Sequence, residues 1–194
     1  MKPAKASSPQ PAMPAAETAP SANKPIVILG VDTAIRCTGY GVVAMTAPGK
    51  FKILDCGVIK NSAKLLHSEC LRRLAGGIRE LVATHHPTVA SIEGVFLGRN
   101  IKTAMTLSLA RGAVIATLAE LGVPVFQYAP SVAKRTAVGR GDATKEQVAL
   151  MMSAFCSVDV AGIPNDSTDA LALAICHGNN CARPELAKFL VHPL

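Results

Sequence analysis

Continuous runs of aliphatic and β-branched residues predict the strands of this chain. The first run, IVILGVD at residues 26–32, is apolar up to its last position and predicts a strand buried on both faces. Residues 41–45 and 51–59 follow a glycine-containing segment and predict two further strands joined by a turn. The first three strands are therefore expected to form an antiparallel meander. Two shorter apolar runs, at 89–92 and 123–128, predict a fourth and a fifth strand.

Helical spacing of apolar residues predicts the elements that follow. Between residues 64 and 84, Leu74, Ile78 and Leu81 recur on one side while arginines fill the other, which indicates an amphipathic helix. Further helices are expected at residues 100–121, 130–138, 143–156 and 166–177. Because strands and helices alternate in the second half of the chain, those strands are expected to be parallel and covered by helices.

Composition divides the chain into three segments. Residues 1–24 are rich in alanine and proline and contain no branched aliphatic or aromatic residue, which predicts a disordered tail. Residues 25–178 carry all the predicted elements and are expected to form one domain, followed by a partly disordered extension at 179–194. The tail has neither the apolar segment of a secretory signal nor the arginines of a transit peptide, so a cytoplasmic protein is expected.

Charge and hydrophobicity limit the classes of protein to which this chain can belong. With 49% hydrophobic and 17% charged residues, the chain has enough apolar side chains for a packed core. Every apolar run is interrupted before the roughly 18 to 20 residues of a membrane span, so no membrane association is expected. The formal net charge is +7, and the tail contributes only two of these charges, so the domain itself is basic. Six cysteines without a CxxC pair indicate free thiols in a reducing compartment.

Four acidic residues differ from the acids on solvated helix faces because they lie at the ends of elements next to apolar runs. Asp32 and Glu93 each end a predicted strand, while Asp166 and Asp169 lie three residues apart on the last helix. If the two strands are neighbours, all four carboxylates meet at one edge of the sheet. Carboxylates that close together favour a hard divalent cation such as Mg²⁺ or Mn²⁺. The alternative is that they are helix caps and ordinary strand ends.

Four segments resemble the motif blocks of the RuvC-type Holliday-junction resolvases, in the family's order. They are ILGVDTAIRCTGYGVV, SIEGVFLGRNIKTAMTLSLARG, VAKRTAVGRGDATKEQV and DSTDALALAICH. The resemblance extends over residues 26–178 and implies an α/β fold of the RNase H-like superfamily, in which helices flank a five-stranded mixed sheet.

The resemblance also implies an activity and its residues. It implies a Mg²⁺-dependent crossover junction endodeoxyribonuclease that resolves four-way DNA junctions by paired symmetric nicks in recombination and repair, leaving 5′-phosphate ends. The matching positions Asp32, Glu93, Asp166 and Asp169 are then the catalytic, metal-binding carboxylates. Two Mg²⁺ ions are expected in each active site, and Mn²⁺ is expected to substitute. A homodimer and a RuvAB-type branch-migration complex are the implied partners.

One position departs from the family pattern. Thr33 and Ala34 stand where the family usually has Pro-Gly after the first aspartate. Glycine would permit positive φ or a close backbone approach, so the loop after the first strand is expected to have a different shape.

Basic residues near the carboxylate segments are the candidate DNA contacts, because cations bind phosphate with little sequence discrimination. An aromatic residue three positions after Glu93 is a candidate for stacking on bases at the crossover, with core packing as its alternative. The candidate DNA-binding residues are Phe96, Arg99, Arg111, Lys134, Arg135, Arg140 and Lys145.

Two alternatives remain open on the sequence, and a third is disfavoured. A nuclease of the same fold with another nucleic-acid target shares the carboxylates, and a non-catalytic junction-binding protein shares the basic residues. A phosphotransferase of the sugar-kinase and actin type requires a second lobe, for which the chain has no room. The apolar faces at 64–84 and 100–121 are both candidates for a dimer interface, as paired cutting requires two sites related by a two-fold axis.

Overall fold

The computed structural model describes residues 25–94, 101–133, 163–182 and 193–194 and shows a five-stranded mixed sheet. The strand order is β3-β2-β1-β4-β5. β1 is antiparallel to β2 and β2 to β3, whereas β4 runs parallel to β1 and β5 parallel to β4. The bounds of the strands are β1 Ile26–Asp32, β2 Cys37–Ala47, β3 Lys50–Lys60, β4 Val89–Glu93 and β5 Val125–Tyr128.

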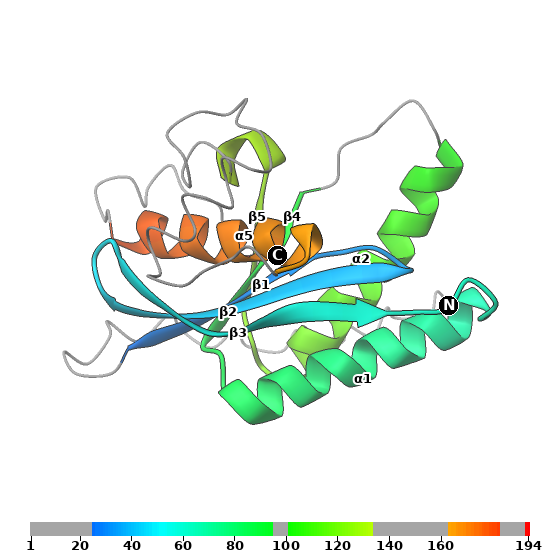
Figure 1. Ribbon diagram of the computed structural model, residues 1–194, viewed down its shortest axis with the longest axis horizontal. Helices are drawn as coiled ribbons and strands as arrows, with labels where there is room; N and C mark the ends of the chain where they lie inside the picture. The colour runs from blue at the N-terminus through cyan, green and yellow to red at the C-terminus, as the bar shows by residue number, and fades with distance from the viewer. Residues whose placement is uncertain (1–24, 95–100, 134–162, 183–192) are drawn as a thin grey trace, which may run out of the picture.

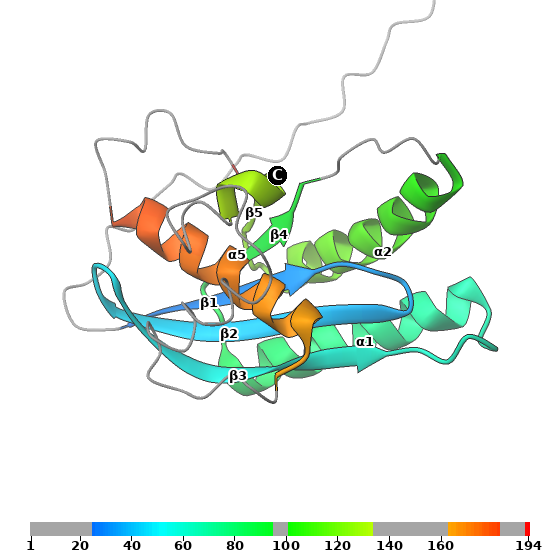
Figure 2. The same ribbon diagram turned by 45° about the horizontal axis from the view of Figure 1, so that its top comes forward.

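Helices cover both faces of this sheet. α1 (His67–His85) and α2 (Ile101–Glu120) lie on one face, and α5 (Asn165–Cys181) crosses the other (Figures 1 and 2). Of the helix expected at 130–138, residues 130–133 are helical, while the remainder and the helix expected at 143–156 lie outside the described residues. The tail at 1–24 and most of the extension at 179–194 also lie outside them.

Two elements are longer than their hydrophobic patterns predicted. β2 begins at Cys37 rather than at residue 41, because Gly39 pairs with Asp32 on one side and with Val58 on the other. A backbone ladder of this kind does not require an apolar side chain, so the run of apolar residues underestimates the strand. α5 continues to Cys181, four residues beyond the expected end.

The face under α1 and α2 holds the larger apolar core. Leu29 and Val31 of β1 and Ile92 of β4 are fully buried there. α1 contributes the periodic residues that predicted it, Leu74, Ile78 and Leu81, and α2 contributes Ala110, Val114 and Leu118. The predicted amphipathic helix therefore buries the expected side. Burial of a large aliphatic side chain contributes roughly 1.5 to 3 kcal/mol.

Within the described part of the chain, α5 covers most of the opposite face and is buried almost all round from Ser167 to Gly178. Leu171 and Ile175 pack on Ile28 and Val43 of the sheet. This explains why α5 is rich in alanine, as small side chains let a helix lie close to the strands on which it packs.

Glycines in β1 and β2 allow an even closer approach of α5. A Cβ on Gly30 would lie 1.9 Å from the carbonyl oxygen of Ala170, and a Cβ on Gly39 would lie 2.0 Å from that of Asp166. Both distances are far below van der Waals contact, so the α5 backbone occupies the space that a side chain would need. The position of the first turns of α5 thus depends on glycine at these two sheet positions.

α2 is the one helix in the described part of the chain that is long and apolar enough to cross a membrane by length and composition. The same test is passed by core helices of soluble proteins, and α2 packs against the sheet through Ala110, Val114 and Leu118. Its first half differs, since Ile101, Met105 and Leu109 are 75%, 65% and 50% exposed. These three residues, spaced by four, form an exposed apolar stripe.

Replacing Gly39 tests the close approach of α5. Gly39→Ala places a methyl group inside the α5 backbone, so the helix must shift, and we expect the free energy of unfolding to fall by about 1 to 3 kcal/mol. Gly76→Ala is the matched control, because a Cβ there meets nothing within 4 Å, and removing a mid-helix glycine stabilises by about 0.5 to 1 kcal/mol. Urea unfolding measures both; equal stability of the two variants would contradict the packing described.

Candidate functional site

Two of the predicted acidic residues end adjacent parallel strands. β1 and β4 pair in parallel with Val31 opposite Ile92, so Asp32 and Glu93 follow at the same edge of the sheet. Both side chains are half-buried. The proposition that these strands are neighbours, on which the sequence argument depended, therefore holds.

α5 adds a third carboxylate to this edge. Asp32, Glu93 and Asp169 line one cavity of about 240 Å³, together with Pro130 and Leu173 among others. The three carboxylates come from β1, β4 and α5, which are distant in sequence, and all three have interactions within the protein. The structure thus brings together three of the four predicted acids around one cavity.

Asp166 lies one strand further along, over β2. The close approach of its backbone to Gly39, the partner of Asp32 in the ladder, places it beside the same edge. Its carboxylate accepts a hydrogen bond from the Cys37 thiol. Burial, together with this hydrogen bond and the charge of Asp166, raises the pKa of Cys37 to about 11, so the thiol stays protonated and remains a donor.

The donor set of this edge fits a hard divalent cation, because carboxylate oxygens are the ligands that Mg²⁺ and Mn²⁺ prefer. Among the described residues no three Asp, Glu, His or Cys side chains lie close enough together to hold an ion as they stand. The shared cavity supports the predicted metal site, and the ligand set of Asp32, Glu93, Asp166 and Asp169 stays a prediction.

Arg111 lies behind Glu93 on the α2 side. Its Nη2 donates to Gln127 Oε1 at 2.6 Å and its Nε to the Glu93 carbonyl oxygen at 3.4 Å. Burial lowers the pKa of this arginine, although the group remains a cation at any physiological pH. A second cavity of about 130 Å³ lies between Arg111, Glu93 and Thr33. Arg111, a candidate DNA contact from the sequence, is therefore engaged with the ends of β4 and β5.

The other candidate DNA-binding residues lie outside the described residues, and their roles stay predictions. They are Phe96, Arg99, Lys134, Arg135, Arg140 and Lys145.

Another cavity that the described residues line lies elsewhere. About 640 Å³ lie between β3 and α1, lined by Lys60, Arg73 and the Asp55–His85 ion pair among others, and by none of the predicted site residues. Because none of the predicted site residues lines this cavity, its size gives no reason to assign it to the carboxylate site.

The loop after Asp32 is closed by a threonine. Thr38, which is 1% exposed, accepts a hydrogen bond from the Ala34 N–H at 3.2 Å and donates one to the Ala34 carbonyl oxygen. Among the described residues other than glycine, only His86 has positive φ. Ala34 therefore needs no glycine-like backbone conformation, and its replacement of the usual glycine causes no backbone strain here.

Comparison with known proteins agrees with this geometry. The family model described as "Crossover junction endodeoxyribonuclease RuvC" matches residues 28–177. The chain belongs to the RuvC family.

Relatives and solved structures of the RuvC family are similar over most of their length. Proteins named crossover junction endodeoxyribonuclease RuvC from Chlorobaculum parvum and from a Roseiflexus species are 42% and 40% identical over 151 and 149 residues. These alignments cover 78% and 77% of this chain, and 80% and 88% of the relatives. A structure of T. thermophilus RuvC in complex with a Holliday junction substrate has a TM-score of 0.79 at 31% identity, covering 87% of this chain and 99% of that one.

The yeast mitochondrial Holliday junction resolvase Ydc2, at 12% identity and a TM-score of 0.57, shares the fold. The predicted RuvC family, RNase H-like fold and class of crossover junction endodeoxyribonuclease are confirmed by these matches.

A polar contact that the sequence did not predict fixes α5 to β5. The Tyr128 hydroxyl lies 2.8 Å from His177 Nδ1, and His177 Nε2 lies 3.2 Å from Cys181 Sγ. Tyr128 pairs with Glu93 in the sheet, and its carbonyl oxygen accepts a hydrogen bond from the Gly94 N–H. The contact thus joins the end of β4, through β5, to the helix that carries Asp169. A buried histidine among apolar residues was the available signal, but its partner is 49 residues away.

Burial of His177 predicts a pH dependence of stability. The apolar surroundings lower its pKa from 6.5 to about 4, so the unfolded chain binds a proton between these values and the folded chain does not. The free energy of unfolding should therefore be highest above pH 6.5 and fall as the pH drops toward 4, by up to about 3 kcal/mol from this residue.

His177→Gln should remove this part of the slope while keeping a hydrogen-bonding group beside Tyr128. Urea unfolding of both proteins at pH 7, 6, 5 and 4.5 measures the difference. Parallel curves for the two proteins would show that His177 is not the group responsible.

Proposed function

We propose that this chain resolves four-way DNA junctions by metal-dependent hydrolysis of two phosphodiester bonds, nicked symmetrically. The observation that carries the proposal is the cavity at the strand ends, lined by Asp32, Glu93 and Asp169 in a member of the RuvC family. The expected products, with 5′-phosphate and 3′-hydroxyl ends, can be rejoined by a ligase, which suits recombination and repair.

The proposed ligands of Mg²⁺, or of Mn²⁺ in its place, are Asp32, Glu93 and Asp169, with Asp166 completing the set from the adjacent turn of α5. When bound, divalent ions activate a water molecule and stabilise the leaving oxygen of a phosphodiester. The carboxylates hold and orient that centre, and the buried walls of Leu173 and Ala172 on α5 limit the access of bulk water.

Four-way junction DNA is proposed as the substrate on two grounds. The solved structure of T. thermophilus RuvC contains a Holliday junction substrate, and this chain aligns with 99% of that one. The net charge of +7 supplies the attraction for phosphate. In this proposal the basic residues that the sequence predicts as DNA contacts position the DNA backbone, and Phe96 stacks on bases at the crossover.

A homodimer is proposed because symmetric nicking of two opposed strands needs two sites related by a two-fold axis. Of the two helices that the sequence offered for the interface, α2 is favoured. Its exposed apolar stripe of Ile101, Met105 and Leu109 is the kind of surface that an isologous contact buries. α2 also carries Arg111 behind Glu93, so the interface and the cavity lie on one helix.

The cytoplasm is the proposed location and a RuvAB-type branch-migration complex the proposed assembly partner. Five cysteines in the described part of the chain are free thiols, which is compatible with a reducing compartment.

Neutralising one carboxylate tests the active site. Asp32→Asn or Asp169→Asn removes a charged ligand and keeps the side-chain volume, so cleavage of a synthetic immobile junction in Mg²⁺ should fall at least about 100-fold. Junction binding, measured by gel shift in Ca²⁺, should persist, because the carboxylates are not phosphate contacts.

Asp55→Asn is the matched control, as this acid pairs with His85 between β3 and α1. It should cut at the wild-type rate. Full cleavage by both Asp32→Asn and Asp169→Asn would reject the proposed site.

A charge in the apolar stripe tests the dimer. Met105→Glu or Leu109→Glu places two like charges across a two-fold contact, so we expect a monomer by light scattering coupled to gel filtration, and loss of paired cutting. Leu54→Glu, at an exposed leucine of β3, is the matched control and should remain a dimer. A dimer in both stripe variants would place the interface elsewhere.

A further inference from the structure

The loop that follows Asp32 is held from the α1 side by a set of contacts that the nuclease chemistry does not itself use. Residues 33–36 connect β1 to β2, and the end of β3 lies beside them. The backbone N–H of Asn61, the residue after β3, donates to the Arg36 carbonyl oxygen at 2.8 Å. β3 thus continues its contact with this part of the chain beyond its last ladder pair, Cys37 with Lys60.

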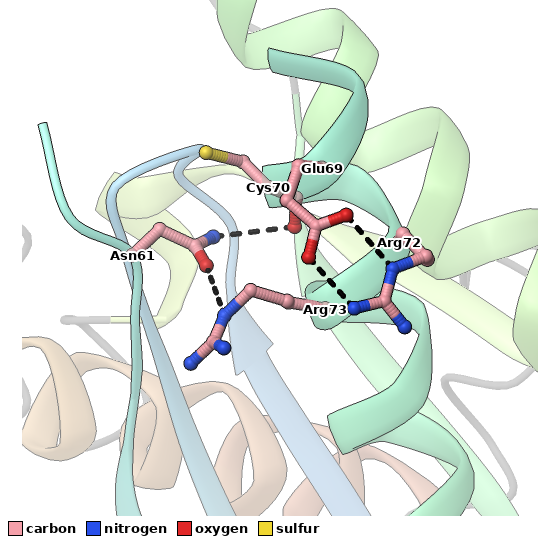
Figure 3. Close-up of polar contacts among 5 residues, drawn as sticks. All are labelled: Asn61, Glu69, Cys70, Arg72 and Arg73. Carbon is pink, nitrogen blue, oxygen red and sulfur yellow. Dashed lines mark hydrogen bonds and ion pairs between the residues drawn. The ribbon is translucent and has the colours of Figure 1, made fainter. Parts of the chain in front are cut away.

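The side chain of Asn61 uses every polar group it has. Its Nδ2 donates to the carbonyl oxygens of Ile35 at 2.9 Å and Cys70 at 3.2 Å, and its Oδ1 accepts from Arg73 Nε at 3.1 Å. Figure 3 shows the amide between Cys70 and Arg73. Asn61 is 9% exposed, so the loss of any of these partners would leave a buried polar group unsatisfied.

Arg36 makes the reciprocal contact. Its Nη1 lies 2.6 Å from the Ser62 carbonyl oxygen, 3.1 Å from that of Leu65 and 3.2 Å from Cys70 Sγ. The loop after Asp32 therefore reaches the connection between β3 and α1, and Asn61 reaches back to the loop. Residues 35–36 and residues 61–62, which are 26 positions apart in the chain, therefore donate side-chain hydrogen bonds to each other's backbone.

Arg73 sets the orientation of the Asn61 amide. Because an arginine has only donors, its contact with Oδ1 turns the NH₂ group toward the two carbonyl oxygens. The neighbouring Arg72 has no part in this, since it is paired with Glu69 at 2.7 Å on the exposed side of α1 (Figure 3). Adjacent arginines of one helix thus provide a test residue and a control.

We infer that Asn61 is a positioning residue for the metal site: it fixes the loop 33–36 and thereby the carboxylate of Asp32 that precedes it. Thr33 in the same loop lines the cavity beside Glu93, so a shift of the loop reaches both strand ends. The inference rests on the proposed role of Asp32 as a metal ligand.

Asn61→Asp separates this role from simple packing. The carboxylate keeps the volume and the contact to Arg73 but faces the Ile35 and Cys70 carbonyl oxygens without a donor. We expect the affinity of the full-length protein for Mn²⁺, measured by calorimetry and by the Mn²⁺ EPR signal, to fall about 10-fold, as is typical when a group supporting a metal ligand is lost. Arg73→Ala should shift the affinity in the same direction by a smaller factor.

The controls assign each outcome. Arg72→Ala removes a neighbouring charge, and Ile78→Val destabilises the α1 core without touching the loop; both should bind Mn²⁺ like the wild type. Wild-type affinity in folded Asn61→Asp would overturn the inference. If Asn61→Asp does not fold, equal affinities of Arg73→Ala and Arg72→Ala would overturn it. Asp32→Asn in the same titration keeps the two proposals apart. Wild-type affinity in Asp32→Asn would reject the ligand set and, with it, this inference, whereas reduced affinity there beside wild-type affinity in Asn61→Asp would overturn this inference alone.

Discussion

The closeness of α5 to the sheet is the constraint on which the rest of this structure depends. The carbonyl oxygens of Ala170 and Asp166 occupy the space that side chains would take at Gly30 and Gly39. A helix resting on ordinary side chains would lie further from the sheet, and its acids would then stand above the strand ends instead of beside them. The glycines of β1 and β2 therefore bring Asp169 to the cavity that Asp32 and Glu93 line.

The remaining contacts hold this arrangement from three sides. Arg111 of α2 forms hydrogen bonds with the ends of β4 and β5, and His177 of α5 forms one with β5. Asn61 forms a hydrogen bond with the loop after β1. The side chains of Arg111, His177 and Asn61 are each buried or half-buried. A buried polar group that loses its partner is costly, so such contacts have a defined geometry, whereas apolar packing alone tolerates small displacements.

The same arrangement links the proposed dimer interface to the carboxylate edge of the sheet. α2 presents an apolar stripe to solvent over its first half and places Arg111 behind Glu93 in its second half. A change at the surface of α2 can therefore reach the end of β4 through one side chain. A single helix that carries both the proposed dimer interface and Arg111, which contacts Glu93, provides a direct physical connection between the two.

The sequence by itself determined the order of the described strands and helices, the buried side of α1 and the four acids at element ends, because these depend on local periodicity and on the end of each apolar run. It also carried the RuvC motif blocks. Tertiary structure decided the features that depend on partners distant in the chain. One is the length of β2, whose Gly39 pairs with two neighbouring strands. The others are the hydrogen bonds of Arg111 with Gln127, of Asn61 with Ile35 and of His177 with Tyr128. A hydrogen bond between residues 26 or 49 positions apart leaves no periodic trace, because it depends only on where folding places the two groups.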